Sequence, residues 1–416
     1  MIKKIVVSLS LLFSLTSLAQ EGTASPYSFY GIGDIKFKGT VDTRSMGGLT
    51  VFPDSIHLNL QNPAHLASLK LTSFAIGGTY ANTKFKSETA DGKARRTTLD
   101  YLAVGIPVGK LGIGFGLIPY SSIGYKIQTL TEEDNPTFSR YSGVGGVNKV
   151  FAGAGYKITK ELNIGASIQY NFGTIETTNL RYLESVQYGT RENNFSDLQG
   201  FNLDFGLSYQ RKLTKKLSLF SSVTYSPESK LKLDNSRTID LIQFLSTGTT
   251  SVIQREDIDV ANTEIKIPSK WSFGTGIGEM KKWMFGGEVT LINNSVLSNR
   301  FNDIDDAAFE NSTRYSLGGY FIPNYNSYSG YFKRIVYRAG LRYENTGLVL
   351  QNKSITDAAM NVGFGLPLSG TFSNININFE YGKRGTTYYN LVEENYFNIS
   401  VGLSLSDKWF IKRKFD

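Results

Sequence analysis

The sequence predicts an all-β protein: a transmembrane antiparallel β-barrel of about 14 strands with an N-terminal plug inside its lumen. Three observations predict this fold. The chain begins with an export signal, and no later segment stays apolar for the roughly 18 residues that a membrane-spanning helix needs. Long stretches also alternate between apolar and polar residues, which is the periodicity of β-strands with one greasy face.

The composition removes several classes of protein. The chain has 416 residues, no cysteine and two histidines, so it has no disulfide, no thiolate metal site and no cysteine nucleophile, and little room for a histidine-based zinc or iron site. Aromatic residues make up 13% of the chain, which excludes an intrinsically disordered protein. We therefore expect an ordered protein with no metal and no cofactor.

Residues 1–19 are predicted to be a signal peptide. Lys3 and Lys4 precede an apolar stretch at 5–15, and Ser17-Leu18-Ala19 forms a cleavage site of the small-x-small type. The mature chain then begins at about Gln20, and the loss of two lysines lowers the formal charge from +8 to +6. No cysteine follows the apolar stretch, so this is not a lipoprotein signal.

The clearest alternation lies between Leu162 and Gly173, in the sequence LNIGASIQYNFG. Side chains of a strand point to opposite faces in turn. One face therefore carries apolar residues and the other carries polar or small ones: Leu162, Ile164, Ala166, Ile168, Tyr170 and Phe172 against Asn163, Gly165, Ser167, Gln169, Asn171 and Gly173.

The length of such segments distinguishes a membrane barrel from a soluble β-sandwich. Alternation recurs at 201–210, 375–381 and 397–405. Strands of a sandwich average about five or six residues, whereas these segments reach about ten, the length of a tilted strand that crosses a bilayer. The length favours the membrane barrel.

Fourteen strands are expected, an even number as in single-chain outer-membrane barrels. Their predicted ranges are 70–82, 96–108, 110–120, 146–158, 161–175, 198–211, 215–227, 262–278, 282–294, 311–323, 333–345, 357–368, 373–383 and 395–406. The barrel thus spans 70–406, followed by a short C-terminal tail at 407–416.

The connections between these strands alternate between short and long. Short turns are expected near 109–110, 159–160, 211–214, 279–281 and 369–371, with a longer one at 324–332. Long polar loops are expected at 83–95, 121–145, 176–197, 228–261, 295–310, 346–356 and 384–394. Short turns of such barrels face the periplasm, so the pattern predicts the outer membrane of a Gram-negative cell, with both termini periplasmic.

Aromatic residues near the predicted strand ends are expected at the level of the lipid headgroups. These residues are Tyr80, Tyr120, Tyr156, Tyr170, Tyr209, Tyr225 and Trp283.

Residues 20–69 are predicted to be a plug, or hatch. They do not alternate and are rich in turn formers such as Ser25-Pro26 and Phe52-Pro53-Asp54. A barrel of about eight strands is filled by its own side chains, so a wider one needs something else to occlude it. The apolar residues of this segment either line a greasy route or hold the plug together: Phe29, Phe37, Leu49, Val51 and Phe52.

The tripeptide Asn62-Pro63-Ala64 stands just before the first strand. In this position, together with the strand count, it resembles the hatch motif of the FadL/TodX-like outer-membrane proteins. Segments 25–34, 44–48, 114–125 and 379–386 also look like a branch of this family. The resemblance covers the mature chain in layout. It implies passive uptake of hydrophobic small molecules, of the fatty-acid or aromatic-hydrocarbon type, although no substrate pocket is assigned residue by residue.

Pro119 and Tyr120 are the candidate site of a lateral exit. Proline donates no hydrogen bond to a β-ladder, so Pro119 is expected to bend the third strand or to end it at the rim. The resemblance implies a kink here that opens a side hole for an apolar solute. Small residues predicted to face the lumen, such as Gly112, Gly114 and Gly116, leave room for either a solute or the plug.

No catalytic, metal or nucleotide site is expected. The only histidines, His57 and His65, fall in the predicted plug and not on a wall facing a membrane substrate. Gly143 to Gly146 lacks the lysine of a phosphate loop, and Asp303, Asp305 and Asp306 lack calcium-loop spacing. Nothing points to nucleic acid.

A second function stays open. FadL-like barrels also occur as non-transporting structural subunits of outer-membrane protein-assembly or secretion complexes. The loops at 176–197 and 228–261, or the basic Lys412-Arg413-Lys414, would then contact partner subunits. The expected partners are thus outer-membrane lipid, with a hydrophobic ligand or machinery subunits. A continuous apolar conduit favours transport, and a filled lumen favours the structural subunit.

Overall fold

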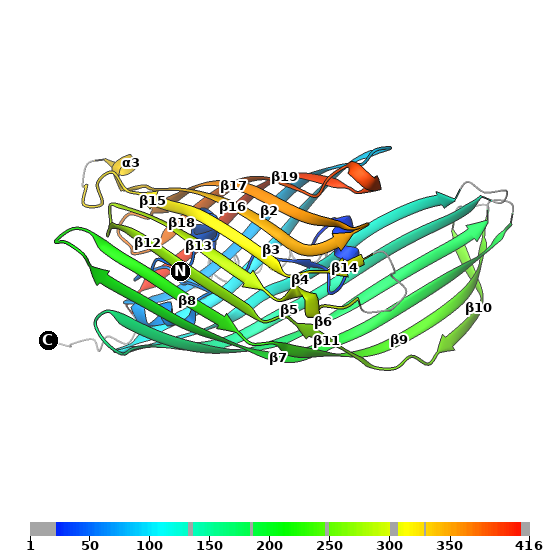
Figure 1. The fold of residues 1–416 in the computed structure, drawn as a ribbon, viewed down its shortest axis with the longest axis horizontal. Helices are drawn as coiled ribbons and strands as arrows, with labels where there is room; N and C mark the ends of the chain where they lie inside the picture. Colours follow the sequence, from blue (N-terminus) through cyan, green and yellow to red (C-terminus); the bar gives the residue numbers. More distant parts are fainter. Residues whose placement is uncertain are drawn as a thin grey trace, which may run out of the picture.

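The protein is a closed antiparallel β-barrel of 14 strands, seen from the side in Figure 1. The computed structural model describes residues 22–131, 136–183, 186–245, 249–299, 307–327 and 330–408. The last wall strand, β19 (Glu393–Asp407), pairs with the first, β2 (Thr72–Lys86), from Asp407↔Thr72 to Glu393↔Lys86. This pairing closes the ring, so every wall strand has two neighbours and the predicted fold class is confirmed.

Twelve of the wall strands are continuous, and the other two are interrupted. The continuous strands are β2, β3 (Asp91–Val108), β4 (Leu111–Thr131), β5 (Thr137–Lys157), β6 (Leu162–Leu183), β7 (Tyr188–Lys212), β13 (Trp283–Ile292), β15 (Ser312–Phe321), β16 (Val336–Leu350), β17 (Lys353–Pro367), β18 (Asn374–Arg384) and β19. The interrupted ones consist of β8 (Ser218–Ser226) with β9 (Ser229–Phe244), and of β11 (Thr263–Ile267) with β12 (Lys270–Glu279). A proline, Pro227 or Pro268, lies in each interruption, since proline cannot donate to the ladder.

Smaller elements lie on the edges and in the connections. Strands β10 (Thr250–Ile258) and β14 (Ala307–Phe309) extend the sheet, and short helices η3 (Asn294–Val296), α3 (Tyr331–Arg334) and η4 (Tyr388–Asn390) lie in loops. Among the described residues, no helix has both the length and the apolar character needed to cross a membrane.

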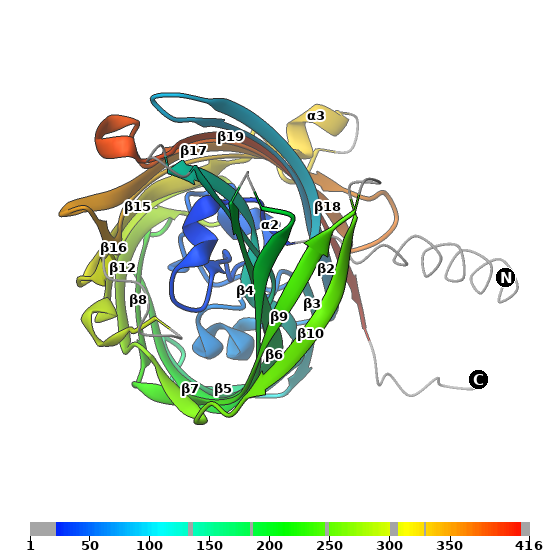
Figure 2. The same ribbon diagram turned by 90° about the vertical axis from the view of Figure 1, so that its right-hand side faces the viewer.

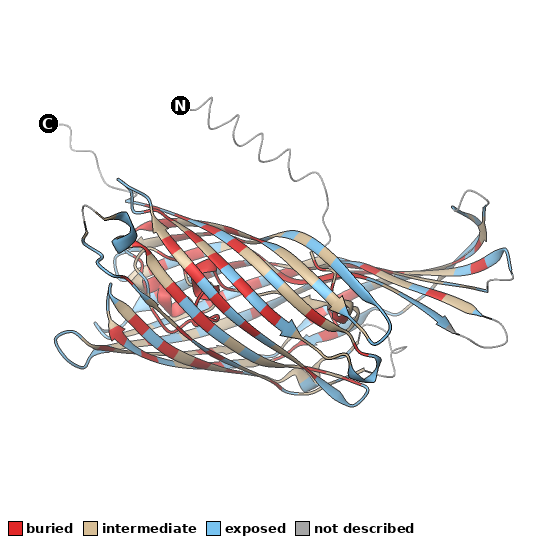
Figure 3. Ribbon diagram, turned by 90° about the horizontal axis from the view of Figure 1, so that it is seen from above, coloured by how far each residue is buried: buried red, intermediate tan, exposed pale blue. Residues whose placement is uncertain are grey.

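The alternating sequence sorts its side chains as predicted. On β6, Ile164, Ile168 and Tyr170 are exposed on the outside of the ring, while Gln169 and Asn171 are buried inside. The same stripes of exposed and buried residues run along the other strands (Figure 3). Apolar residues therefore face lipid, and polar residues face the lumen.

The strands are longer than expected, so the predicted long loops at 83–95, 121–145, 176–197, 228–261 and 346–356 are largely wrong. Strands β4 to β7, β9 and β10 continue past the ring as paired hairpins, at the right of Figure 1. In these extensions most residues are polar, so the alternation of apolar and polar residues that predicted the strands is lost. The backbone nevertheless keeps its hydrogen bonds by continued pairing. This part is called the long-hairpin end.

Residues 22–71 form the plug, which lies inside the ring in the end-on view of Figure 2. Its regular elements are short: η1 (Pro26–Phe29), β1 (Asp34–Ile35), α2 (Val41–Arg44) and η2 (Pro63–Ser68). Such short elements are stabilised by packing against the wall and not by their own hydrogen bonds.

Candidate functional site

The plugged lumen is the candidate functional site, and the Asn-Pro-Ala segment anchors one side of it. The Asn62 side chain accepts a hydrogen bond from the Ala64 backbone N–H at 3.0 Å and so caps η2. Its amide nitrogen donates to the Leu207 carbonyl of β7 at 3.3 Å. Pro63 occupies the first turn of η2, where its missing N–H costs nothing. The motif thus starts a helical turn and fastens that turn to the wall.

The wall receives η2 on a cradle of glycines from four adjacent strands. These glycines are Gly112 of β4, Gly155 of β5, Gly165 of β6 and Gly206 of β7. A Cβ added at Gly155 would lie 2.6 Å from the Pro63 carbonyl oxygen, and one added at Gly165 would overlap the backbone of Pro63 and Ala64. The backbone of the plug therefore lies directly on the backbone of the wall.

The other predicted lumen glycines divide between plug and wall. Gly114 faces the Leu66 side chain of the plug. Gly116 instead lies against the neighbouring strand β3, at Leu102 and Ala103. The sequence left open whether these small residues make room for a solute or for the plug. At Gly112 and Gly114 the neighbouring atoms belong to the plug.

A hydrophobic cluster fills the lumen at the long-hairpin end. Phe29 of the plug meets Tyr125 of β4 edge to face, with ring centroids 5.0 Å apart. Around this pair, side chains of six wall strands converge on the plug residue Ile32: Tyr120, Ile123, Val147, Ile175, Leu198, Leu231, Leu233, Ile265 and Ile267. We call this set the outer core.

Phe52 lies in a second cluster further along the lumen. Its ring packs edge to face on Phe220 of β8 with a centroid distance of 5.6 Å, beside the buried Leu49 and Val51. The fifth apolar residue of the plug, Phe37, lies under the Arg44 guanidinium at 4.9 Å. Phe29 and Phe52 thus both belong to packed clusters.

Pro119 lies at a bulge in β4. The pairing of β4 with β5 shifts register between Pro119 and Ser121. On its other side, β4 pairs with β3 only from Leu111↔Val108 to Leu117↔Leu102, and beyond this point the two strands separate. Strand β1 of the plug pairs there with Ser121 and Ser122 of β4.

Tyr120 points into the lumen and is only 5% exposed. Its assignment to the aromatic belt is therefore wrong. Tyr120 has the parity of Gly112 and Gly114, which already face inward, and it keeps this direction as the extra residue of the bulge. The belt residues Tyr80, Tyr156 and Tyr170 are exposed on the outside.

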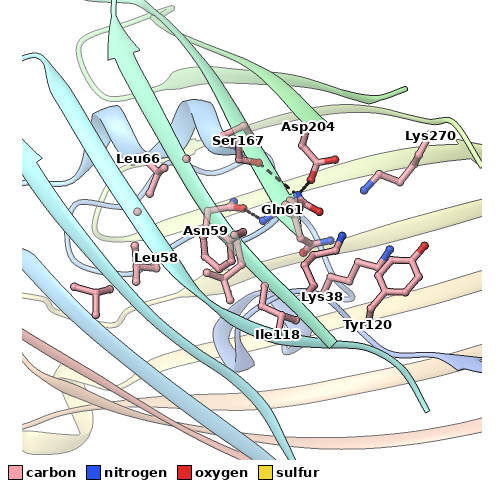
Figure 4. A pocket seen from close by; sticks show the side chains of 18 residues that line it. Lys38, Leu58, Asn59, Gln61, Leu66, Ile118, Tyr120, Ser167, Asp204 and Lys270 are labelled. Atoms are coloured by element: carbon pink, nitrogen blue, oxygen red, sulfur yellow. Dashed lines mark hydrogen bonds between the residues drawn. The ribbon is translucent and has the colours of Figure 1, made fainter. Parts of the chain in front are cut away.

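Two of the cavities among the described residues lie between plug and wall. The larger, of about 190 Å³, is lined by charged residues of both. In it Arg384 of β18 pairs with Asp34 at 2.7 Å, Arg44 with Asp100 of β3 at 3.4 Å, and Arg342 of β16 with Asp357 at 3.1 Å. The smaller, of about 30 Å³, lies between η2 and strands β4 to β7 (Figure 4).

Comparisons with known proteins assign the family. The family model described as BamG matches residues 1–416. The chain belongs to the BamG family. No curated protein matches the sequence.

Solved structures share the fold of this BamG-family chain at low sequence identity. The Pseudomonas putida toluene transporter TodX has a TM-score of 0.59 at 16% identity, covering 91% of this chain and 100% of its own. The CymD monoaromatic hydrocarbon channel has a TM-score of 0.54 at 15% identity, covering 91% and 99%. A Pseudomonas aeruginosa FadL homologue has a TM-score of 0.56 at 11% identity, covering 89% and 98%. The FadL/TodX-like fold is therefore confirmed, and the BamG-family barrel is an outer-membrane barrel.

The sequence analysis missed the charged residues of this lumen. Lys149 has the inward parity of Val147 and Phe151 on β5, and Arg342 has that of Arg338 on β16. A charged residue at an inward position of an alternating strand could have predicted a charged group in the lumen. Several partners of these cations lie on other strands, such as Asp357 and Glu380 for Arg342, and the sequence did not predict which groups would meet. Asp303, Asp305, Asp306, Lys412, Arg413, Lys414 and the signal peptide lie outside the described residues.

The two histidines of the plug have different environments. His57 Nδ1 lies 2.9 Å from Asp54 Oδ2, and the Asp54 carboxylate raises the pKa of His57 above its usual value despite burial. Conversely, the pKa of Asp54 is lowered, by His57 and by the Ile56 and His57 backbone N–H groups, against the opposing effect of burial. The Asn59 side-chain amide nitrogen donates to His65 Nδ1 at 3.0 Å. Burial lowers the pKa of His65 to about 4, so this histidine is neutral.

The His57–Asp54 pair predicts how this part of the plug responds to pH. Because the pKa of folded His57 is raised, its stabilising charge is fully present below about pH 6.5, the unfolded value, and is lost as the pH rises through the raised pKa. We expect residues 54–58 to exchange amide hydrogens faster at pH 9 than at pH 6, after correction for intrinsic exchange. His57→Gln should remove this difference, and equal protection of the wild type at both pH values would contradict the assignment.

Proposed function

We propose that this protein is a non-transporting structural barrel, a subunit of an outer-membrane protein-assembly or secretion complex. The observation that carries the proposal is the filled lumen. The outer core closes the long-hairpin end, an ion-pair network joins plug and wall, and the glycine cradle brings the two backbones into contact. A solute could pass through the lumen only if the outer core, the ion pairs and the contacts at the glycine cradle were all broken.

The two cavities described above do not suit an apolar solute. An apolar cavity of about 150 Å³ is large enough for benzene. The smaller cavity has about 30 Å³, far below that size. The larger has about 190 Å³ but is lined by Arg44, Arg342 and Arg384 with carboxylates around them. An aromatic ring placed there would strip water from charges without replacing its hydrogen bonds.

The gap between β3 and β4 lies at the edge of the apolar band and not within it. Below the bulge, Ile113 and Phe115 of β4 are exposed on the outside. Above it, the exposed residues of β4 include Lys126 and Gln128, and the exposed residues of β3 include Arg95 and Thr97 but also Leu99. A solute leaving through this gap would therefore meet apolar side chains on the side of the bulge and polar ones beyond it.

Two surfaces could bind protein partners in such a complex. One is the long-hairpin end, where paired strands extend well past the ring (Figure 1). The other is the rim of the short turns, which such barrels place in the periplasm. Among the described residues of this rim, the cations outnumber the three carboxylates Glu161, Glu279 and Asp407: Lys110, Lys157, Lys160, Arg211, Lys212, Lys215, Lys216, Lys281, Lys282, Lys333 and Arg334. Such a rim attracts acidic partner surfaces.

Passive uptake of a hydrophobic small molecule, with a lateral exit at Pro119, is the second candidate. The smaller cavity supports it, because Leu58, Leu66 and Ile118 give this cavity an apolar side that lies close to the bulge. Two proteins that share this fold are a monoaromatic hydrocarbon channel and a toluene transporter. In this function the plug must move before a solute passes.

One experiment separates the two functions. The tagged protein is purified from its own outer membrane in mild detergent, its partners are cross-linked and identified, and the pure barrel is tested in liposomes for uptake of toluene and oleate. We expect stoichiometric outer-membrane partners and uptake no faster than through empty liposomes.

Two variants serve as controls for this experiment. Lys215→Glu with Lys216→Glu reverses charge on the rim and should weaken a periplasmic partner without changing the barrel. Pro119→Val should change neither the set of cross-linked partners nor the uptake of toluene and oleate into liposomes. Transport would be favoured instead if the protein were purified without partners, if its liposomes took up solute faster than empty ones, and if Pro119→Val abolished this uptake.

A further inference from the structure

Three lysines of the lumen line the smaller cavity. Figure 4 labels two of them, Lys38 and Lys270. Lys38 belongs to the plug, between β1 and α2. Lys149 comes from β5, and Lys270 is the first residue of β12. They therefore bring positive charge to one point from the plug and from two separate parts of the wall.

An aromatic ring is the contact that two of these lysines share. The Lys38 ammonium lies 4.0 Å from the centroid of the Tyr120 ring, and that of Lys149 lies 4.6 Å from the same centroid. Lys149 is only 6% exposed. A cation over a ring gains some electrostatic attraction, but the ring carries no charge to neutralise it.

Asp204 of β7 is the one carboxylate among the residues that line this cavity. Ser226 donates to its Oδ1 and Gln169 to its Oδ2. Within the described residues, no salt bridge joins Asp204 to any of the three lysines. Three amines thus share this cavity with a single carboxylate. Burial, with the charges of Lys149 and Lys270, holds the pKa of Lys38 well below its usual value, so Lys38 favours the neutral amine where no anion offsets this repulsion.

We propose that Lys38, Lys149 and Lys270 form a binding site for a small oxyanion, of the size of phosphate or acetate, which ties the plug to the wall. Charge-assisted hydrogen bonds from ammonium groups are strong in such partly dry surroundings. The cavity of about 30 Å³ has room for a few atoms of this kind.

The amide of Gln61 is a further donor to this site. Gln61 lines the cavity, and its Oε1 is buried without a hydrogen-bond partner. Because the oxygen and nitrogen of an amide are interchangeable by a flip, Gln61 can turn its NH₂ group to an anion. Leu58, Leu66 and Ile118 fill the opposite side and leave no space for an acyl chain.

The test measures acetylation of Lys38 in the full-length protein, in mild detergent at pH 8, by peptide mass spectrometry. The buffer is HEPES at constant ionic strength, with or without inorganic phosphate. Phosphate should slow the acetylation of Lys38 by a factor of 1 + [phosphate]/Kd, or about tenfold at ten times Kd. The exposed Lys70 is the internal control and should not change.

Variants tie the effect to the cluster. Lys149→Met should abolish the protection of Lys38. Lys36→Met is the matched control, because Lys36 is the neighbouring lysine of the plug but pairs with Asp34 at 3.2 Å in the other cavity. It should leave the protection intact. If Lys149→Met does not fold, Lys270→Met, at the less buried start of β12, gives the same comparison.

Two results would overturn the proposal. One is an acetylation rate of Lys38 that phosphate and acetate leave unchanged, which means that the cluster relieves its charge by losing a proton. The other is protection by decanoate at far lower concentration than by acetate, which means that the site holds an acyl chain. Protection by phosphate and acetate alike supports a small-oxyanion site.

Discussion

Gly165→Leu is expected to expel the plug from the barrel. Gly165 lies at the centre of the cradle, where even a Cβ would overlap Pro63 and Ala64, and the obstacle is backbone that cannot rotate away. Overpacking of a tight contact costs about 1–3 kcal/mol when side chains can adjust. Here the wall is fixed by its ladder, so η2 has to leave. We expect protease cleavage within residues 22–71 and ion conductance in planar bilayers, where the wild type resists both.

Gly92→Leu is the matched control for this variant. Gly92 lies on β3 with its nearest neighbour, Phe85, at 3.8 Å from an added Cβ, so leucine is accommodated. It should leave protection and conductance at the wild-type level. A folded Gly165→Leu barrel with an intact, non-conducting lumen would contradict the view that backbone contact seats the plug.

Arg342→Met is expected to destabilise the barrel by about 3–5 kcal/mol, the usual cost of removing one partner from a buried ion cluster. The Arg342 side chain is 17% exposed and lies 3.1 Å from Asp357, 3.4 Å from Glu380 and 3.5 Å from Glu344. Its loss leaves these carboxylates close together with no cation between them. The measurement is reversible urea unfolding in lipid vesicles.

Two further variants show whether uncompensated charge is the cause. Adding Asp357→Asn and Glu380→Gln to Arg342→Met should restore much of the lost stability, because the repelling charges are gone. Lys230→Met removes an exposed ion pair with Glu264 and should not change stability measurably. If the triple variant is as unstable as Arg342→Met, lost packing and not charge is responsible.

The barrel itself was predictable because lipid imposes a rule that acts on each strand separately. Ile164, Ile168 and Tyr170 had to face outward, and Gln169 and Asn171 inward, whatever their neighbours in space. The same rule does not predict the parts of the strands that extend beyond the membrane, because lipid does not select their side chains. Most residues of 176–183 and 188–197 are polar, without a sustained apolar face, so the pairing between β6 and β7 is what shows that they are strand.

The site depended on contacts that no local pattern encodes. The sequence by itself determined the alternating wall, its fourteen strands and the Asn-Pro-Ala segment, because each follows from residue type and spacing within one stretch. Only the tertiary structure decided that Gly112, Gly155, Gly165 and Gly206 meet under one helical turn, or that Lys38 faces Lys149 and Lys270. The shear of a barrel brings residues from distant strands to the same height, and the path of the plug fixes which of them it touches.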